Sequence, residues 1–399
     1  MRLVQNITSS IRWFGSAVGI IRVETELTRY LASRYDVTHV CLDQDNQRFS
    51  VIPPQLVQNI LADAPPEHSE VEQATAERAV YLKEAKAFTS DRDDTFVSLG
   101  SDWSFQVPRL LAEMYDKPQA VFACYDSIPL IYPEKTPDPY FENQFKRHYV
   151  DMAHTARGVF AISQHSKNDL LAFWKRADIA TTTPHVEAIP LASLPPSKPS
   201  ARLSADDQAT LESVDGDRGF VLYVSSIEPR KNHELLLHIW RDLCRARGKA
   251  MPTLVFVGRK GWGSESLLAQ MQRMLAFRAR KIIWLSDLGD ALLSQLYARC
   301  QFSLFPSIYE GWGLGVSEAM SFGKVCAVAN TSSLEEAAQG LMPALHPLDY
   351  PEWRQLVARL IDDSRYREQL EADIASKYRQ RNWAQVGRDF CDTLLDNNI

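Results

Sequence analysis

Two glutamates enclose a glycine-rich stretch, Glu310-Gly-Trp-Gly-Leu-Gly-Val-Ser-Glu318. A carboxylate accepts hydrogen bonds from the vicinal hydroxyls of a ribose or a hexose. Glycines let the backbone approach a ligand closely, and a following helix offers free N–H groups and a positive dipole end to a phosphate. The stretch therefore predicts a wall that binds a phosphorylated sugar; a tight structural turn with solvated carboxylates is the alternative. The contacts are expected from Glu310, Gly311, Trp312, Gly313, Leu314 and Glu318.

A second candidate is the pair Arg230-Lys231, which follows the apolar run 220–224. The planar fork of an arginine and the compact charge of a lysine both suit a diphosphate, and both neutralise it as it leaves. Ser226 belongs to the same turn. A solvated helix start is the alternative for such a pair.

The elements that position these residues alternate along the second half of the chain. Short apolar runs are followed by amphipathic stretches, which indicates parallel βαβ units and a doubly wound sheet. The strands are expected at 220–224, 253–257, 281–285, 301–305 and 325–329. The first half is similar, with a helix at 19–33 and strands at 37–42, 95–99, 119–123 and 158–162. Ligands of such sheets bind outside the carboxyl ends of the strands.

A Pro- and Ser-rich run at 190–200 divides the chain almost in half. Proline resists helix and central strand, so this run predicts an interdomain linker. We expect an N-terminal domain at 1–192, a linker at 193–216 and a C-terminal domain at 217–380. A last helix within 381–399 is expected to cross back to the first domain.

Several of these segments resemble retaining glycosyltransferase family 4, which includes bacterial lipopolysaccharide mannosyltransferases and sucrose synthases. The resemblance is carried by residues 305–319, 222–233, 257–263, 17–24 and 125–134. It implies an α/β fold of the GT-B type, with two Rossmann-like doubly wound domains facing across a cleft. It also implies transfer of a hexose from a nucleoside diphosphate to a hydroxyl, with retention of the anomeric configuration.

The resemblance further implies a role for each matching residue. Glu310, Arg230, Lys231 and Asp126 are expected to be catalytic, and Glu318, Gly19, Ser226, Arg259, Ser286 and Leu288 to bind the donor with residues 311–314. A purely structural turn competes with a donor contact at Arg259. Two positions depart from the family pattern: Ser225 stands where a glycine is common, and Tyr125 stands where a histidine lies at the transferred sugar.

Two short segments indicate which donor and acceptor the resemblance implies. Residues 128–130 and 332–335 most resemble mannosyltransferases of polysaccharide assembly. GDP-mannose is therefore the first choice, with a UDP-hexose, GDP-fucose or dTDP-rhamnose as alternatives. The acceptor is expected to be a glycan or lipid-linked oligosaccharide in surface polysaccharide synthesis. A nucleotide-sugar-binding scaffold without activity is a second class, and a nicotinamide-dependent oxidoreductase a third, for which the glycine spacing is wrong.

Composition bounds the remaining possibilities. The formal net charge of −6 gives no bulk support to a nucleic-acid partner. The cysteines are scattered singly, and the acidic runs at 43–45 and 91–94 are interpreted as loop carboxylates, so neither a metal nor another cofactor is expected. We expect a cytoplasmic protein, since no apolar run is long enough for a signal peptide or a membrane span. The apolar and basic run 170–176 is compatible with peripheral membrane contact or with an ordinary core-facing helix.

Overall fold

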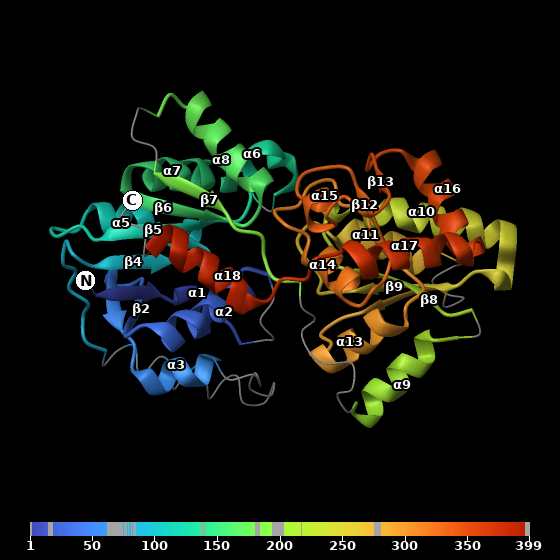
Figure 1. Cartoon of the computed structure of the whole chain (residues 1–399), viewed down its shortest axis with the longest axis horizontal. Helices are drawn as coiled ribbons and strands as arrows, with labels where there is room; N and C mark the ends of the chain where they lie inside the picture. Colours follow the sequence, from blue (N-terminus) through green and yellow to red (C-terminus); the bar gives the residue numbers. More distant parts are fainter. Residues whose placement is uncertain are drawn as a thin grey trace. The chain divides into compact units, whose positions relative to one another are not determined.

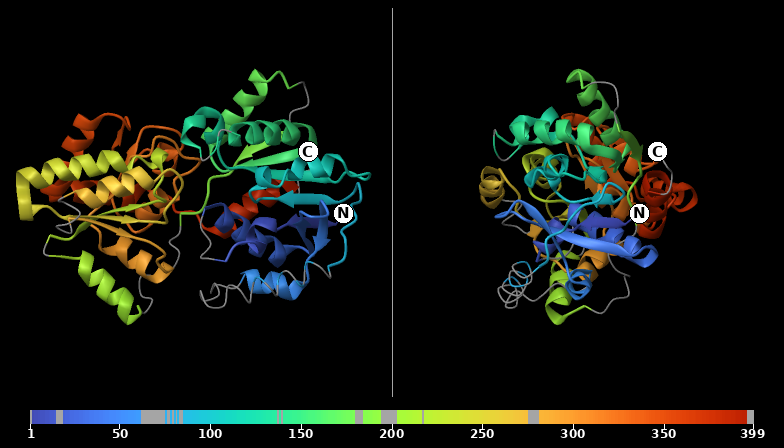
Figure 2. Two further views of the ribbon diagram at one scale, coloured as in Figure 1. Left: turned by 180° about the vertical axis from the view of Figure 1, so that it is seen from behind. Right: turned by 90° about the vertical axis from the view of Figure 1, so that its left-hand side faces the viewer.

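The computed structural model describes residues 2–14, 19–61, 75, 78, 80, 82, 85–136, 138, 140–179, 184–193, 203–216, 218–274 and 281–395. The chain forms two compact units. The first comprises Met1–Pro133, Asp138–Leu191 and Asn382–Ile399, and the second Glu134–Pro137 and Ala192–Arg381. Each unit is built on one sheet flanked by helices (Figures 1 and 2).

The sheet of the first unit has seven strands in the order β3-β2-β1-β4-β5-β6-β7. All neighbouring pairs are parallel except β2 with β3. The strands are β1 (Leu3–Asn6), β2 (Val37–Asp43), β3 (Arg48–Val51), β4 (Thr95–Ser98), β5 (Gln119–Cys124), β6 (Ala156–Ala161) and β7 (His185–Ala188). The helices include α1 (Thr8–Ile11), α2 (Gly19–Arg34), α3 (Pro54–Leu61), α5 (Val107–Ala112), α6 (Ile128–Ile131), α7 (Phe141–Thr155) and α8 (Gln164–Arg176).

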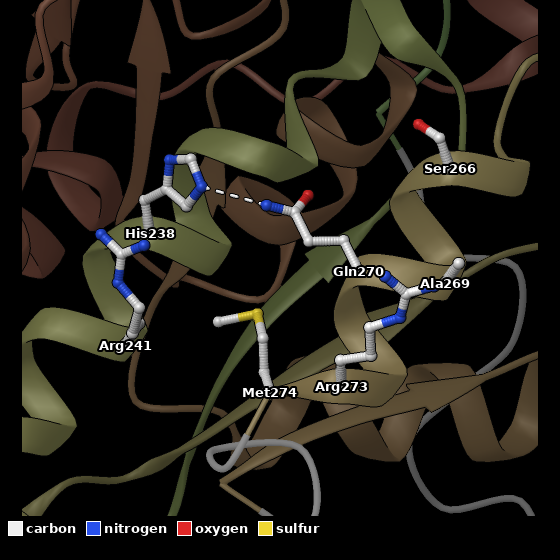
Figure 3. Close-up of a pocket in the computed structure, with 7 residues that line it drawn as sticks. All are labelled: His238, Arg241, Ser266, Ala269, Gln270, Arg273 and Met274. Atoms are coloured by element: carbon white, nitrogen blue, oxygen red, sulfur yellow. Dashed lines mark hydrogen bonds between the residues drawn. The ribbon is translucent and has the colours of Figure 1, made fainter.

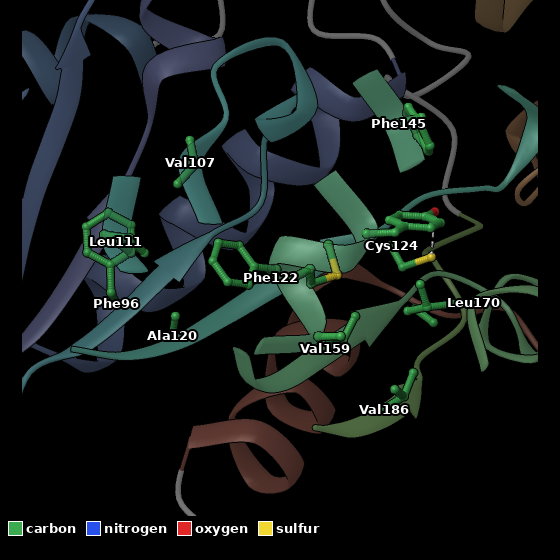
Figure 4. Packing of buried hydrophobic residues seen from close by; sticks show 14 of the residues in the cluster. Phe96, Val107, Leu111, Ala120, Phe122, Cys124, Phe145, Val159, Leu170 and Val186 are labelled. Carbon is green, nitrogen blue, oxygen red and sulfur yellow. Dashed lines mark hydrogen bonds between the residues drawn. The ribbon is translucent and has the colours of Figure 1, made fainter. Parts of the chain in front are cut away.

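The core of this unit is a continuous apolar cluster on the central strands. Phe96, Phe122 and Val159 of the sheet pack with Phe145 of α7 and Leu170 of α8 (Figure 4). Near-complete exclusion of water from aromatic and aliphatic side chains of this kind is the main stabilising term of such a fold.

The C-terminal segment belongs to the first unit. It consists of α18 (Trp383–Phe390) and one π-helical turn (Cys391–Leu395). Gly387 lies so close to Tyr30 of α2 that a Cβ there would meet the ring at 2.3 Å. Arg157 of β6 donates to the carbonyl of Leu394 at 2.6 Å. Close packing and a strand-end hydrogen bond thus hold this segment on the first sheet, although it follows the second unit in sequence.

The second unit has a six-stranded sheet in the order β10-β9-β8-β11-β12-β13, with parallel pairing. The strands are β8 (Phe220–Val224), β9 (Thr253–Val257), β10 (Ile282–Leu285), β11 (Ser303–Phe305), β12 (Cys326–Ala329) and β13 (Ala344–Leu345). The helices include α9 (Ala205–Val214), α10 (His233–Arg247), α11 (Glu265–Arg273), α13 (Asp290–Arg299), α14 (Leu314–Ser321), α15 (Leu334–Ala337), α16 (Tyr350–Asp362) and α17 (Ser364–Lys377).

The predicted linker is too long. Residues 205–214 form α9, whose Ser204 cap accepts a hydrogen bond from the Asp207 N–H at 3.1 Å. Leu211 and Val214 of this helix are fully buried. The proline-rich composition ends before this helix, so the linker expectation extended past the residues that justify it. Residues 194–202 lie outside the described part of the chain.

Candidate functional site

The predicted residues of the second unit gather at one edge of its sheet. Strands β8, β9, β10 and β11 end at Val224, Val257, Leu285 and Phe305, and the candidate segments follow each of these ends. The strand order reverses between β8 and β11: strands β8 to β10 follow one another toward one edge of the sheet, and strands β11 to β13 toward the other. Open α/β sheets bind their ligands at such a switch point.

A buried ion cluster lies at this switch point. Glu310 accepts from Lys231 Nζ through Oε1 at 2.5 Å and from Arg230 Nη1 through Oε2 at 2.9 Å. Glu310 is 6% exposed and Lys231 is 8% exposed. Burial alone would raise the pKa of Glu310, but the charges of Lys231 and Arg230 overcome it and lower the pKa to about 2. Burial, with the nearby charge of Arg230, lowers the pKa of Lys231, against the opposing effect of Glu310.

The backbones that carry these residues are bonded to each other. Ile308 N–H donates to the Arg230 carbonyl at 2.8 Å, and Arg230 Nη1 also donates to the Tyr309 carbonyl at 3.1 Å. Asn232 adopts a left-handed conformation (φ 58°), and its Nδ2 donates to the carbonyls of Pro306 at 3.1 Å and Pro347 at 2.8 Å. The turn with the cations is therefore fixed to the loop with the glutamate.

The glycine-rich loop is held from the other side by two serines. Ser332 Oγ accepts from the Glu310 N–H at 2.9 Å, and Ser333 Oγ bonds the carbonyls of Glu310 and Trp312, both at 2.9 Å. These serines were noted in the sequence only for their family resemblance, and their contact with the loop depends on the β12–α15 turn. The side chain of Trp312 is 7% exposed, so it contributes to packing.

Glycine is required at two positions of the loop, for two different structural reasons. Gly313, the residue before α14, has φ 103°, which side chains rarely adopt. A Cβ at Gly315 would meet the ring of Phe305 at 2.7 Å and the Val224 carbonyl at 2.9 Å. Gly315 therefore lets α14 pack directly against β11 and β8. Of the other predicted residues, Gly311 lies in the loop and Leu314 is the first residue of α14.

Glu318 lies on α14 and is 7% exposed. Its Oε2 accepts from the hydroxyl of Tyr297 on α13 at 2.9 Å. Tyr297 is fully buried, and burial, with the charge of Glu318, raises its pKa well above the usual value. Tyr297 carries no signal in the sequence, because it lies within an ordinary amphipathic helix and only the fold brings its hydroxyl to Glu318.

The other predicted donor contacts lie on neighbouring loops of the same edge. Ser226 donates to Glu228 at 2.5 Å, and Arg259 forms an exposed ion pair with Asp287 at 2.9 Å. Ser286 is exposed and Leu288 is half-buried. Ser226 is linked to Arg230 of the ion cluster through Glu228, whereas the ion pair of Arg259 is with Asp287.

The predicted residues of the first unit lie beyond the ends of its own strands. Asp126 follows β5, and its carboxylate accepts from the Ile128 N–H at 2.9 Å, at the first residue of α6. The preceding Tyr125 is buried and its hydroxyl donates to the Leu99 carbonyl. Gly19 begins α2 with φ 51° and is exposed. Tyr125 thus fills the core at the position where family members carry a histidine at the sugar.

Two carboxyl groups that sequence analysis did not select are buried in the same region. Burial raises the pKa of Glu24 on α2 to about 7, although hydrogen bonds from Ser10 oppose the shift. Burial likewise raises the pKa of Asp102 to about 8, against a hydrogen bond of 2.7 Å from Ser98. Glu24 ends the segment 17–24 that resembles the family, but no role was assigned to it, and the burial of both carboxyl groups follows only from the packing of the folded unit.

The acidic runs noted in the sequence have structural partners. Asp43 accepts from Asn46 at 2.6 Å, and Asp94 forms an ion pair with Arg2 at 2.6 Å. Within the described ranges, no group of three or more His, Cys, Asp or Glu side chains is arranged to hold a metal ion. Within the same ranges no helix combines the length and apolar character that crossing a membrane requires.

Residues 170–176 lie in α8 and direct their apolar side chains into the protein. Leu170 is fully buried, and Trp174 is 1% exposed with its indole donating to the Tyr149 carbonyl at 2.8 Å. Leu171 and Phe173 pack against the same core. The run thus forms a core-facing helix, as the second of the two interpretations expected, and peripheral membrane contact of the chain stays a prediction.

A cavity of about 510 Å³ lies apart from these residues. His238 and Arg241 of α10 face Gln270 and Arg273 of α11 across it (Figure 3). The distance from Gln270 Nε2 to His238 Nε2 is 3.2 Å. It contains no residue predicted to bind the donor.

Comparison with known proteins gives a consistent result. Residues 207–374 match the model of the family described as "Glycosyl transferases group 1". O-antigen chain mannosyltransferase B of Escherichia coli is 30% identical over 166 residues, which are 42% of this chain and 43% of that protein. Serotype-specific mannosyltransferase WbdA of Escherichia coli is 25% identical over 270 residues, which are 67% of this chain and 32% of that protein. The matches thus span less than half the length of these relatives.

Solved structures resemble the chain over almost its whole length. Anabaena Alr3699/HepE in complex with UDP-glucose matches with a TM-score of 0.64 and 15% identity, covering 99% of both chains. The α,α-trehalose 6-phosphate synthase of Burkholderia multivorans matches with a TM-score of 0.65 and 14% identity, covering 98% of both chains. The predicted GT-B fold of two Rossmann-like domains is confirmed. The chain resembles bacterial O-antigen mannosyltransferases, and its residues 207–374 match the family model of the glycosyl transferases group 1.

Proposed function

We propose that this chain is a retaining glycosyltransferase that moves a hexose from a nucleoside diphosphate to a hydroxyl of a glycan or lipid-linked acceptor in surface polysaccharide synthesis. The observation that carries the proposal is the buried cluster of Glu310, Arg230 and Lys231 at the switch point of the second sheet. Two cations beside a glycine-rich loop suit a diphosphate, and a carboxylate next to them suits a sugar hydroxyl.

In this proposal Arg230 and Lys231 stabilise the diphosphate as negative charge builds on it during departure. Glu310 positions the hexose, and Glu318 binds the ribose while Tyr297 holds its carboxylate in place. Glu310 pairs with both cations and offsets part of their positive charge inside the protein. The two cations also supply the charge that a divalent metal would otherwise provide, so we propose that the reaction needs no metal.

Mannose from GDP-mannose is the first choice of donor, because the curated relatives are mannosyltransferases. A UDP-hexose is the second choice, because a solved structure of the same fold contains UDP-glucose. GDP-fucose and dTDP-rhamnose follow. In the first unit, Asp126 is the proposed contact to an acceptor or sugar hydroxyl through its carboxylate, which accepts from the Ile128 N–H, and Gly19 is proposed to bind the donor.

A thermal-shift panel of nucleotides and sugar nucleotides tests the donor. A ligand that binds the native state raises the melting temperature according to its affinity, so GDP and GDP-mannose are expected to stabilise the protein more than the UDP and dTDP compounds. Stabilisation by UDP and UDP-glucose alone would assign the second-choice donor. If no nucleotide stabilises the protein, the proposed function is wrong.

Activity is tested with labelled sugar nucleotides. We expect transfer or slow hydrolysis of the donor by the wild type, and losses of orders of magnitude in Glu310→Ala and Lys231→Ala. Donor binding without any hydrolysis or transfer would favour a non-catalytic scaffold. Near-wild-type rates in both variants would exclude the assigned site.

A further inference from the structure

The guanidinium of Arg230 lies between two carboxylates. Its Nη1 donates to Glu310, and its Nε lies 3.2 Å from Oε2 of Glu228. The side-chain contacts described for Glu228 go to Arg230 and Ser226, whereas Lys231 contacts Glu310. The two cations therefore share Glu310, and Arg230 has an additional carboxylate of its own.

Glu228 is itself held in one orientation. Its Oε1 accepts from Ser226 Oγ at 2.5 Å, and its side chain is 13% exposed. A Cβ on Gly261 would lie 2.4 Å from its Cγ and 2.9 Å from the Ile227 carbonyl. Gly261 therefore leaves the space that Glu228 occupies, and both carboxylate oxygens of Glu228 are engaged. Such a restrained acceptor can fix the direction of the group that it bonds.

The two carboxylates around Arg230 differ in what a donor would do to them. A diphosphate would compete with Glu310 for Arg230 Nη1 and Lys231 Nζ, because both nitrogen atoms already donate to Glu310. The contact of Glu228 is with Nε, on another edge of the planar guanidinium. Glu228 can therefore keep its bond while Arg230 changes partner at Nη1.

We propose that Glu228 is a positioning residue that keeps the Arg230 guanidinium oriented toward the departing diphosphate. The proposal rests on the proposed function of the same site. Without Glu228, Arg230 and Lys231 still attract a diphosphate, so ground-state affinity is maintained. The oriented hydrogen bonds that strengthen as charge builds on the leaving group are lost, so the chemical step slows.

The test compares Glu228→Ala, Arg230→Ala and the double variant with the wild type. Donor kcat and KM are measured with GDP-mannose and UDP-glucose, and GDP and UDP binding by calorimetry. Glu228→Ala should lower kcat about 10- to 100-fold, the loss typical of a misplaced catalytic group, with KM and nucleotide affinity within about threefold of wild type. In the Arg230→Ala background the same substitution should have no further effect, because the two residues act as a unit.

Two further variants separate positioning from simple structural damage. Gln at 228 can accept from Nε with its oxygen and donate to Ser226 with its amide, so Glu228→Gln should restore most of kcat. Glu265→Ala removes an exposed carboxylate of the same unit, which pairs with Lys260 at 3.0 Å, and should leave all parameters unchanged.

Independent, additive effects of Glu228→Ala and Arg230→Ala would overturn the inference, as would a loss of nucleotide affinity equal to the loss of kcat. These results are distinct from a failure of the proposed function. In that case the wild type itself would bind neither GDP nor UDP, and no variant would be informative about transfer.

Discussion

Replacement of Glu310 by glutamine tests the energetics of the ion cluster directly. Glu310 is buried, and the charges of Lys231 and Arg230 outweigh the effect of burial and lower its pKa from an ordinary value of 4.5 to about 2. The difference of about 2.5 pH units corresponds to about 3 kcal/mol of folding free energy at neutral pH, at about 1.4 kcal/mol per unit. Because the folded-state pKa is lowered, this contribution is present above pH 4.5 and is lost as the pH falls toward 2.

Glu310→Gln is therefore expected to destabilise the second unit by about 3 kcal/mol at pH 7 and by much less near pH 3. The measurement is hydrogen exchange by mass spectrometry in increasing urea, followed on peptides of α14, since a two-unit chain has no single unfolding transition. Peptides of the first sheet serve as the internal control. Equal stability of the variant at pH 7, or a loss that does not depend on pH, would refute the charge-based explanation of the cluster.

The remaining predictions concern other parts of the two units. Burial raises the pKa of Glu24 to about 7, so the folded protein favours the protonated carboxyl group and its stability should fall as the pH rises from about 4.5 through 7. Glu24→Gln should therefore raise the melting temperature relative to the wild type more at pH 8.5 than at pH 5. A difference that does not depend on pH would exclude this role for Glu24. Gly315→Ala should lower the stability of the second unit by about 1–3 kcal/mol by overpacking, measured by hydrogen exchange of α14 peptides in increasing urea. Gly216→Ala, with open space around its Cβ, should have little effect. Tyr297→Phe should weaken GDP or UDP binding about fivefold in calorimetry, because it removes a hydrogen bond of about 1 kcal/mol to Glu318; unchanged affinity would separate Glu318 from nucleotide binding.

The strands of the second unit could be predicted closely from sequence. The runs 220–224 and 253–257 are β8 and β9 with the same bounds, because strands buried on both faces are short, continuous apolar runs. The strand β1 at Leu3–Asn6 was missed, since Gln5 and Asn6 interrupt its apolar pattern. Both are buried, and their side chains bond Thr28 and Ser98, partners that lie far away in the sequence.

The ion cluster could be anticipated only in part. Glu310, Arg230 and Lys231 were each identified as candidates. The cations were expected to bind a diphosphate and the carboxylate a sugar, and no contact among the three residues was expected. The direct pairing of the three requires the register between β8 and β11, which no local pattern contains. For the same reason Glu228 was not selected: its contact with Arg230 depends on a turn whose shape is set by Gly261 on another loop.

The bonds that tie the turn of Asn232 to the loop of Glu310 have a consequence for kinetics. Because Pro306, Ile308 and Tyr309 are joined to that turn through backbone groups, the cations and the carboxylate are already arranged before a ligand arrives. Little conformational entropy remains to be lost in this unit when a nucleotide binds. Association with the isolated nucleotide should then occur in a single phase whose rate is limited by diffusion and falls with ionic strength, and not by the folding of a loop.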